Sequence, residues 1–449
     1  MRIKRITVKK YKNLVDFDCE FSDSNISAFI GNNGAGKSNV LEVITLAFST
    51  AKNVAADKKM GLIVFHDIYG CKIEYEYNGV FYTLCVDKSD ICVLCDEKQL
   101  TEKQMLPVLP DTIMLYYAGE TDRQQKAAKV TFDEKYNNAL KSKVSTNLNF
   151  PGFKFLDYYS TEDINLLLLT AAVFQGDYYE KLLKYLNCSG IETSTSLTLM
   201  NPKGKSGDGG TYWNAHGFVK SFLDELRKYV SATVDLGDIY RMVFKDISLW
   251  SKTSENEAAL FARLKALKSA RYLYMLDVNL IRDDGSKFAY YELSEGEKQL
   301  VLLYLLTSFT AKNNCLYLFD EFDSYLHLNW QRSISEMLRN INVDGHIIFT
   351  THSPGTISQI KKDNLYIMRN GQVVYPASET FNRALDEIML EQMDVSMLPP
   401  EVEDLYDKFK QSVAERKKEQ AEHWMKQLEQ ILDKNNPLFL KMRINLRRI

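Results

Sequence analysis

One eight-residue segment constrains the fold of this chain more than any other feature. Residues 31–38 read Gly-Asn-Asn-Gly-Ala-Gly-Lys-Ser and match the pattern G-x-x-x-x-G-K-[ST] in full. The short apolar run Ile26–Ile30 precedes this segment, and an amphipathic pattern that begins at Asn39 follows it. A glycine-rich loop between a strand and a helix cradles phosphate groups. The sequence therefore predicts a phosphate-binding loop in an α/β fold, against the alternative of a chance glycine-rich turn.

The residue types in this loop fit a nucleotide. Glycines let backbone N–H groups turn inward around phosphates. We expect Lys37 to reach the β- and γ-phosphates and Ser38 to ligate Mg²⁺ through its hydroxyl. The predicted nucleotide-binding residues of this segment are Gly31, Asn32, Asn33, Gly34, Ala35, Gly36, Lys37, Ser38 and Asn39.

Two acids follow a second apolar run. Cys315–Phe319 has the length and composition of a buried strand, and Asp320 and Glu321 come directly after it. We expect this strand to lie beside the phosphate-loop strand, so that Asp320 faces the Mg²⁺ shell through water and Glu321 polarises the attacking water. Taken alone, the segment would be better explained as a buried strand followed by a solvated turn. The upstream loop favours the catalytic interpretation.

The segment Leu293–Gln299 precedes the acids and opens a predicted helix. Ser294 is a candidate N-cap, and Glu297 stands three residues later, as in a capping box. One interpretation is simply a well-capped helix. The functional interpretation is that the Ser294 hydroxyl, the Gly296 backbone and the helix N-terminus bind a γ-phosphate held by a second subunit.

A histidine follows the next predicted strand, His346–Thr350. A single histidine after a strand is more often structural than catalytic. Here the strand comes soon after the acidic one, so we expect His352 to lie near the γ-phosphate as a sensor.

The chain divides into four predicted regions. Residues 1–120 form the first lobe with the phosphate loop, and 286–376 form the second lobe with the acids and His352. Between them, residues 121–285 have mainly helical patterns, so we predict a helical insertion. Residues 377–449 form a helical C-terminal region with a helical hairpin around the charged run Glu415–Glu419.

Composition limits the surroundings in which this chain works. The formal net charge is −3, so any contact with nucleic acid should come from a local patch or from a partner. The apolar runs are shorter than the roughly 20 residues of a membrane span, so we expect no membrane association. Seven scattered cysteines indicate free thiols in a reducing compartment. A cytoplasmic location is expected.

The order of these segments resembles the ABC-type ATPases of the RecF, SMC and Rad50 group. Residues 31–38 correspond to Walker A, 293–299 to the signature motif, 315–321 to Walker B and 323–327 to the D-loop, with His352 as the switch histidine. In that group, ATP and Mg²⁺ are sandwiched between two chains. The resemblance implies nucleotide and metal contacts for Lys37, Ser38 and Asp320, and Glu321 as the base. It also implies contacts in trans for Ser294, Gly296 and Glu297, in a homodimer or a higher homo-oligomer.

Three further segments, Leu109–Gly119, Tyr212–Val219 and Pro399–Glu401, resemble bacterial defence ATPases. The Septu ATPase family (PtuA), also found beside some retrons, has such segments, and the PARIS ATPases are similar. That resemblance implies a sensor of phage infection that acts with an HNH nuclease subunit, with a reverse transcriptase and non-coding RNA as further partners. Gln124 and Gln125 are Q-loop candidates by position.

Two other functions stay open at this point. A repair or recombination ATPase of the RecF or SMC type would bind DNA itself, but the chain has no long heptad arms and is not basic. A transporter ATPase would not need so long an insertion between residues 38 and 293.

Overall fold

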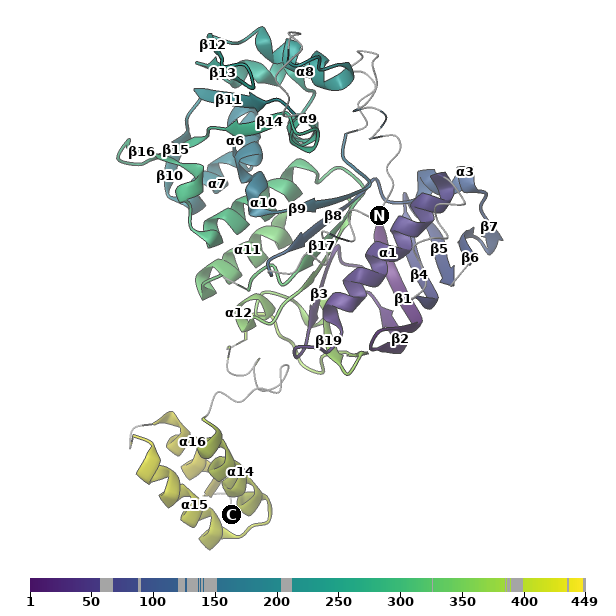
Figure 1. Ribbon diagram of the computed structural model, residues 1–449. Coiled ribbons are helices and arrows are strands. Elements are labelled where there is room, and N and C mark those ends of the chain that lie inside the picture. The colour runs from purple at the N-terminus through teal and green to yellow at the C-terminus, as the bar shows by residue number, and fades with distance from the viewer. Residues whose placement is uncertain are drawn as a thin grey trace. The chain divides into compact units, whose positions relative to one another are not determined.

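The computed structural model contains two compact units, Met1–Asn382 and Arg383–Ile449. Figure 1 shows the larger unit as layered sheets and helices and the smaller one as helices. The structure describes the whole chain except residues 57–67, 88–89, 120–125, 127–135, 137, 139, 141–151, 203–211, 325, 384, 386–387, 389–398, 434–435 and 447–449. Within the described residues, no helix combines the length and the apolar character needed to cross a bilayer.

A seven-stranded sheet forms the centre of the larger unit. Its neighbours pair in parallel except at one edge, where a hairpin turns back. The three central strands are buried along their whole length, which is typical of parallel strands covered on both faces. In spatial order the strands are β20 (Gln372–Val374), β19 (Leu365–Arg369), β3 (Ile26–Ile30), β18 (His346–Thr350), β17 (Cys315–Asp320), β8 (Thr112–Tyr117) and β9 (Leu156–Tyr159).

The expectation that the acid-bearing strand lies beside the phosphate-loop strand is wrong. β18 lies between β17 and β3 and pairs in parallel with both. The long connections between parallel strands allow a strand to skip a neighbour, so order along the chain does not fix order in the sheet. Because all three strands run in the same direction, the segments that follow them still meet at one edge of the sheet.

A second, antiparallel sheet covers helix α1 (Lys37–Ala56). Buried side chains of α1, of this sheet and of the central sheet form one hydrophobic core, and Figure 1 shows α1 between the two sheets. The β-branched and aromatic runs at 72–77, 80–86 and 91–94 favour strands, and the structure contains a strand at each of them, whereas a similar run at 61–65 lies outside the described residues. The strands and short helices are β2 (Leu14–Glu20), β1 (Arg2–Tyr11), β4 (Tyr69–Tyr77), β5 (Val80–Asp87), β6 (Asp90–Cys95), β7 (Lys98–Gln99), α3 (Glu102–Met105) and η1 (Leu106–Val108).

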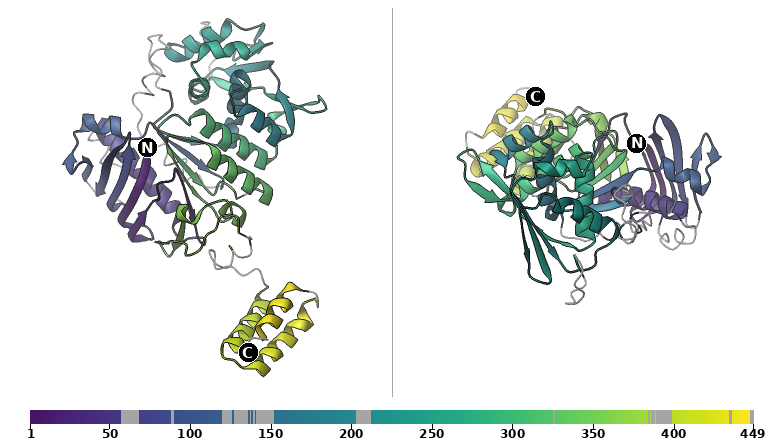
Figure 2. Two further views of the ribbon diagram at one scale, coloured as in Figure 1. Left: turned by 180° about the vertical axis from the view of Figure 1, so that it is seen from behind. Right: turned by 90° about the horizontal axis from the view of Figure 1, so that it is seen from above.

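Helices cover the opposite face of the central sheet. Figures 1 and 2 show α10 and α11 on the side away from α1. Helix α10 starts immediately after Ser294, as its cap predicts. The elements of this layer are α10 (Glu295–Phe309), α11 (Leu328–Asn340), α12 (Pro354–Ile357) and η6 (Lys362–Asn364).

The predicted helical insertion is more mixed than its sequence pattern indicated. Its helices are present, but seven strands form a four-stranded sheet, β12-β13-β11-β14, and a three-stranded sheet, β10-β15-β16. Most of these strands have only three or four residues, too few for alternation to stand out. The described elements are η3 (Thr161–Asp163), α6 (Ile164–Phe174), α7 (Tyr179–Leu186), β10 (Cys188–Ile191), β11 (Thr195–Met200), α8 (Gly217–Arg227), β12 (Ala232–Asp235), β13 (Ile239–Phe244), η4 (Ser248–Thr253), α9 (Glu257–Ser269), β14 (Leu273–Leu276), β15 (Asn279–Arg282), β16 (Lys287–Ala289) and η5 (Tyr290–Glu292).

The smaller unit contains the predicted helical hairpin and one further helix. The hairpin consists of α14 (Pro400–Ala414) and α15 (Lys418–Ile431), and α16 (Pro437–Leu446) follows. The hairpin turns within the predicted charged run, where Arg416 adopts a left-handed conformation (φ +56°). The unit has its own small hydrophobic core, formed by Val402, Phe409, Ala421, Leu428, Phe439, Met442 and Leu446.

Candidate active site at the carboxyl edge of the central sheet

The loop between β3 and α1 has a backbone that only glycine adopts easily. Gly31 and Gly36 have φ values of +141° and +110°. A Cβ atom added at Gly31 would lie 2.3 Å from the carbonyl oxygen of Met368, so a side chain does not fit there. The loop is therefore closely packed at its base, while Asn32, Asn33 and Gly34 at its tip are exposed.

Lys37 is the centre of the hydrogen-bond network under this loop. Its Nζ donates to the carbonyl oxygens of Gly31 (2.9 Å) and Asn32 (3.3 Å) and contacts Nε2 of His352 at 2.5 Å. All three N–H groups of the ammonium therefore have acceptors. Burial lowers the pKa of Lys37 to about 8, although the nearby carboxylates of Glu321 and Asp320 act in the opposite direction.

The contact with Lys37 fixes the protonation of His352. A nitrogen that accepts from an ammonium carries no proton, so Nε2 is bare and the ring is neutral. Burial, assisted by the Lys37 charge, lowers the pKa of His352 to about 4, which agrees with this assignment. His352 Nε2 also lies 3.9 Å from Oε1 of Glu321. His352 thus stands between the lysine of the loop and the second acid.

Asp320 and Ser38 meet at the end of β17. Ser38 Oγ donates to Oδ1 of Asp320 over 3.0 Å, and Thr350 Oγ1 donates to the same oxygen over 2.6 Å. The side chain of Asp320 is buried. A hydroxyl and a carboxylate oxygen at this separation are the ligand types that Mg²⁺ prefers, so these two residues fit the predicted metal site.

Glu321 occupies an unusual backbone conformation. Its φ is +49°, in the left-handed region that costs a non-glycine residue of order 1–3 kcal/mol. The backbone N–H of Glu321 donates to Thr350 Oγ1 (2.8 Å), which holds this turn against the end of β18. Burial and then the charge of Asp320 raise the pKa of the Glu321 carboxyl.

The residues after Glu321 are tied to the His352 segment. Oδ2 of Asp323 accepts from Thr351 Oγ1 (2.5 Å) and from Thr356 Oγ1. Burial raises the pKa of Asp323 to about 6. The predicted D-loop segment and the switch segment are therefore one hydrogen-bonded unit, although Tyr325 within it lies outside the described residues.

Sequence reasoning missed one residue that supports the loop. Asn13, in the turn between β1 and β2, donates through Nδ2 to the carbonyl oxygen of Gly34 (2.8 Å). Its Oδ1 accepts from Nδ2 of Asn39 (2.6 Å). A lone asparagine in a turn carries no motif, so only the tertiary contact identifies it. Thr350, which bonds the Asp320 carboxylate and the backbone N–H of Glu321, is the last residue of a predicted strand, and the sequence assigned it no role.

The Ser294–Glu297 segment forms the predicted capping box. Ser294 Oγ accepts from the backbone N–H of Glu297 (3.3 Å), and a carboxylate oxygen of Glu297 accepts from the backbone N–H of Ser294 (2.8 Å). Ser294 is exposed, and Gly296 is partly exposed beside Leu326. Both bonds join residues of the same segment, and the segment lies at the N-terminus of α10. The Q-loop candidates Gln124 and Gln125 lie outside the described residues.

A family comparison agrees with this geometry. The family described as the RecF/RecN/SMC N terminal domain matches residues 2–374. The chain belongs to this family. It is accordingly an ATPase of the P-loop type, and the matched residues include both lobes and the insertion between them.

Two relatives match along most of their length. The chain is 23% identical over 461 residues to the "Retron Ec83 probable ATPase" of Escherichia coli, covering 92% of this chain and 79% of that protein. It is 20% identical over 427 residues to the "Retron Vc95 probable ATPase" of Vibrio cholerae serotype O1 biovar El Tor, covering 85% and 77%. Among solved structures, the SMC head domain from Thermotoga maritima is 13% identical with a TM-score of 0.37, covering 84% of this chain and 99% of that one.

Proposed function

We propose that the chain binds ATP with Mg²⁺ at the β3–α1 loop and hydrolyses it. The observation that carries this proposal is the cluster of Lys37, Ser38, Asp320, Glu321 and His352 at one sheet edge. Lys37 would bind the β- and γ-phosphates, and Ser38 and Asp320 would hold the metal. Bound Mg²⁺ would neutralise phosphate charge during the transfer.

Glu321 would act on the attacking water. Its carboxylate accepts the proton that water loses, and its raised pKa brings it nearer to the working pH, which favours a general base. The hydrogen bond from its backbone N–H to Thr350 fixes the position of the turn. His352, whose Nε2 lies 3.9 Å from Oε1 of Glu321, would act beside this carboxylate as a neutral hydrogen-bonding group.

The Ser294–Glu297 segment would complete the site of a second copy. Ser294 is exposed at a helix N-terminus, where backbone N–H groups and the helix dipole favour an anion. We infer that Ser294, Gly296 and Glu297 contact the γ-phosphate of a partner chain. This arrangement makes the active form a homodimer or a higher homo-oligomer.

We further propose that the ATPase is a cytoplasmic subunit of an anti-phage defence complex. The support is the similarity, over most of both chains, to two proteins described as retron ATPases. The Septu-like and PARIS-like segments of the sequence point to the same role. The chain would control a separate effector, an HNH nuclease, with a reverse transcriptase and its RNA as further partners.

A second candidate function is DNA repair with direct DNA binding. It is favoured by 27% identity over 158 residues, 31% of this chain, to the "DNA double-strand break repair Rad50 ATPase" of Archaeoglobus fulgidus. Against it, cations of the β1 strand are neutralised within the chain. Lys4 pairs with Asp23 and Glu76, and Arg5 pairs with Asp18.

Expression with the neighbouring genes separates these functions. For the defence function, we expect wild-type chain to reduce phage plating only together with the adjacent nuclease gene, and Glu321→Gln to change that protection. For repair, the chain alone should bind DNA ends and restore survival after DNA breaks. Protection that persists without the nuclease gene would contradict the proposal that a separate nuclease is the effector. If the purified chain does not hydrolyse ATP, the catalytic proposal is wrong.

A further inference from the structure

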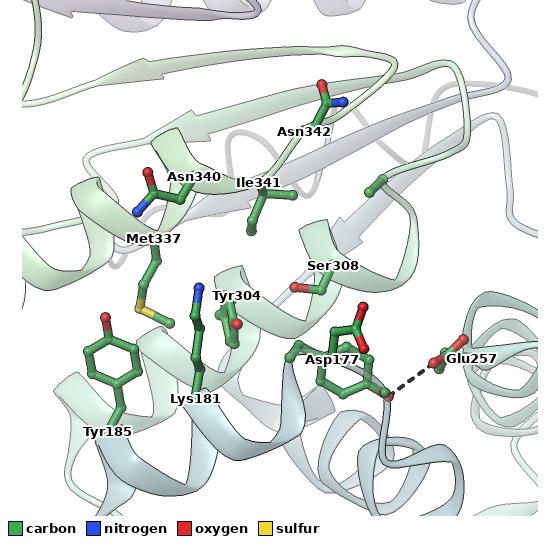
Figure 3. Close-up of a pocket in the computed structure, with 13 residues that line it drawn as sticks. Asp177, Lys181, Tyr185, Glu257, Tyr304, Ser308, Met337, Asn340, Ile341 and Asn342 are labelled. Carbon is green, nitrogen blue, oxygen red and sulfur yellow. Dashed lines mark hydrogen bonds between the residues drawn. The ribbon is translucent and has the colours of Figure 1, made fainter.

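A pocket of about 560 Å³ lies at the junction of the insertion with helices α10 and α11. Figure 3 shows its walls, which come from α7 and the residues just before it, the end of α10 and the end of α11, with Glu257 of α9 at one side. This volume lies within the roughly 300–1,000 Å³ of small-molecule sites. None of the residues of the phosphate-loop cluster lines it, so it is a different place in the molecule.

One side of the pocket presents hydrogen-bond donors. Figure 3 shows the Lys181 side chain rising between Tyr185 and Tyr304 toward Met337. Among the described residues, neither the Lys181 ammonium nor the Tyr304 hydroxyl has a hydrogen-bond or ion-pair partner. Tyr304 is only 6% exposed, and burial raises the pKa of its hydroxyl to about 12, so it stays a donor. Lys181 is exposed, and the Tyr304 hydroxyl is accessible from the pocket, so both donors are available to a ligand.

The other side of the pocket is acidic. The exposed Asp177 lines it, and Oε1 of Glu257 accepts a hydrogen bond from the Tyr178 hydroxyl (3.3 Å). The amides of Asn340 and Asn342 line the rim and offer both donors and acceptors. A ligand that satisfies these walls has an anionic group at one end, hydrogen-bond donors at the other and a body of considerable size.

We propose that this pocket binds a nucleotide, with its phosphate at Lys181 and Tyr304 and its amino-bearing base toward Asp177. Phosphate accepts from ammonium and phenol groups, and exocyclic amino groups of bases donate to carboxylates. A lone phosphate would leave most of the volume empty, and an apolar ligand would use neither the donors nor the carboxylate. The ligand is either a free mononucleotide or the terminal nucleotide of a strand, because the contacts are the same.

A ligand here would connect the insertion with the ATPase. Helix α10 begins at the exposed Ser294, and α11 follows the turn that holds the two acids. Both helices end in the wall of the pocket, and α7 of the insertion forms the opposite wall. The regulatory consequence rests on the proposed ATPase function. Binding of a nucleotide in the pocket does not depend on that function, so it can be measured separately.

The test uses the full chain with Lys37→Ala, which silences the phosphate loop. Isothermal titration calorimetry is carried out with nucleoside monophosphates, ribose and deoxyribose forms, with a 5′-phosphorylated single-stranded oligonucleotide and with inorganic phosphate. We expect saturable binding of at least one nucleotide, about tenfold or more tighter than inorganic phosphate. Tighter binding of the oligonucleotide would identify the strand end as the ligand, and tighter binding of a mononucleotide the free form.

Two variants and a matched control locate the ligand. Added to Lys37→Ala, Lys181→Glu should weaken binding about tenfold or more, and Tyr304→Phe should weaken it severalfold, because each removes a phosphate donor. Lys184→Glu changes the same charge on the same helix outside the pocket and should leave the dissociation constant unchanged. No saturable nucleotide binding, or an equal loss with Lys184→Glu, would overturn the proposal. ATP hydrolysis by the chain with Lys37 intact is a separate readout of the proposed function.

Discussion

At the phosphate loop, Lys37 is 5% exposed and its three N–H groups all have acceptors in its own chain. At the start of α10, Ser294 is exposed and its hydroxyl bonds with Glu297, three residues away. The first region is therefore an arranged site that can be described within one chain. The second is an exposed helix N-terminus whose hydrogen bonds are local. This difference agrees with the proposal that the segment contacts a γ-phosphate held by a partner chain.

The strongest test of the buried region removes its base. Glu321→Gln keeps the shape of the side chain but cannot accept a proton, so turnover should fall by about 10²–10⁴ while ATP binding persists. Steady-state phosphate release and equilibrium nucleotide binding measure the two effects. Unchanged turnover would assign the base to another residue.

Replacing the cation of the loop should weaken ATP binding itself. Lys37→Ala removes the charge that is expected to meet the phosphates, so ATP affinity should fall by about 10²-fold. Titration with a fluorescent ATP analogue measures this loss, and the thermal unfolding midpoint controls for folding. Affinity equal to that of the wild type would refute the assigned role of Lys37.

The exposed region can be tested across the subunit boundary. Gly296→Trp should abolish hydrolysis while ATP still binds at the loop, because the bulky ring blocks a partner's γ-phosphate. Mixed with Lys37→Ala chains, it should restore about a quarter of wild-type turnover, since half of randomly paired dimers keep one intact composite site. Subunit exchange is confirmed by differently tagged chains. If exchange occurs and no activity returns, the two-chain site is contradicted or its two halves must act together.

A smaller effect is expected from the residue that ties the acids together. Thr350→Val preserves the shape of the side chain but removes the donor to Asp320 and the acceptor for the Glu321 N–H. Turnover should fall about tenfold with little loss of ATP affinity. Thr350→Ser keeps the hydroxyl and should retain most of the activity. Equal losses in both variants would mean that packing, and not hydrogen bonding, explains the effect.

Local features of the fold could be predicted from the sequence, and features set by tertiary contacts could not. The start of α10 followed from Ser294 and Glu297, because a capping box involves neighbours along the chain. The position of β17 relative to β3 did not, because strand order depends on the crossovers. Asn13 was missed for the same reason, since its partner Gly34 is distant in the sequence. The short strands of the insertion gave too few residues for their period to be recognised.

The Lys37 ammonium donates to His352, so this histidine and a bound phosphate would compete for the same donor. Any phosphate that engages Lys37 competes with Nε2 of His352, which is held at 2.5 Å. The segment that carries His352 is hydrogen-bonded to Asp323 through Thr351 and Thr356. A change at His352 is therefore coupled to the turn that follows Glu321. Nucleotide binding at Lys37 would therefore leave Nε2 of His352 free to accept a hydrogen bond from another donor. Through this change of partner, the state of the phosphate loop would affect the turn after Glu321.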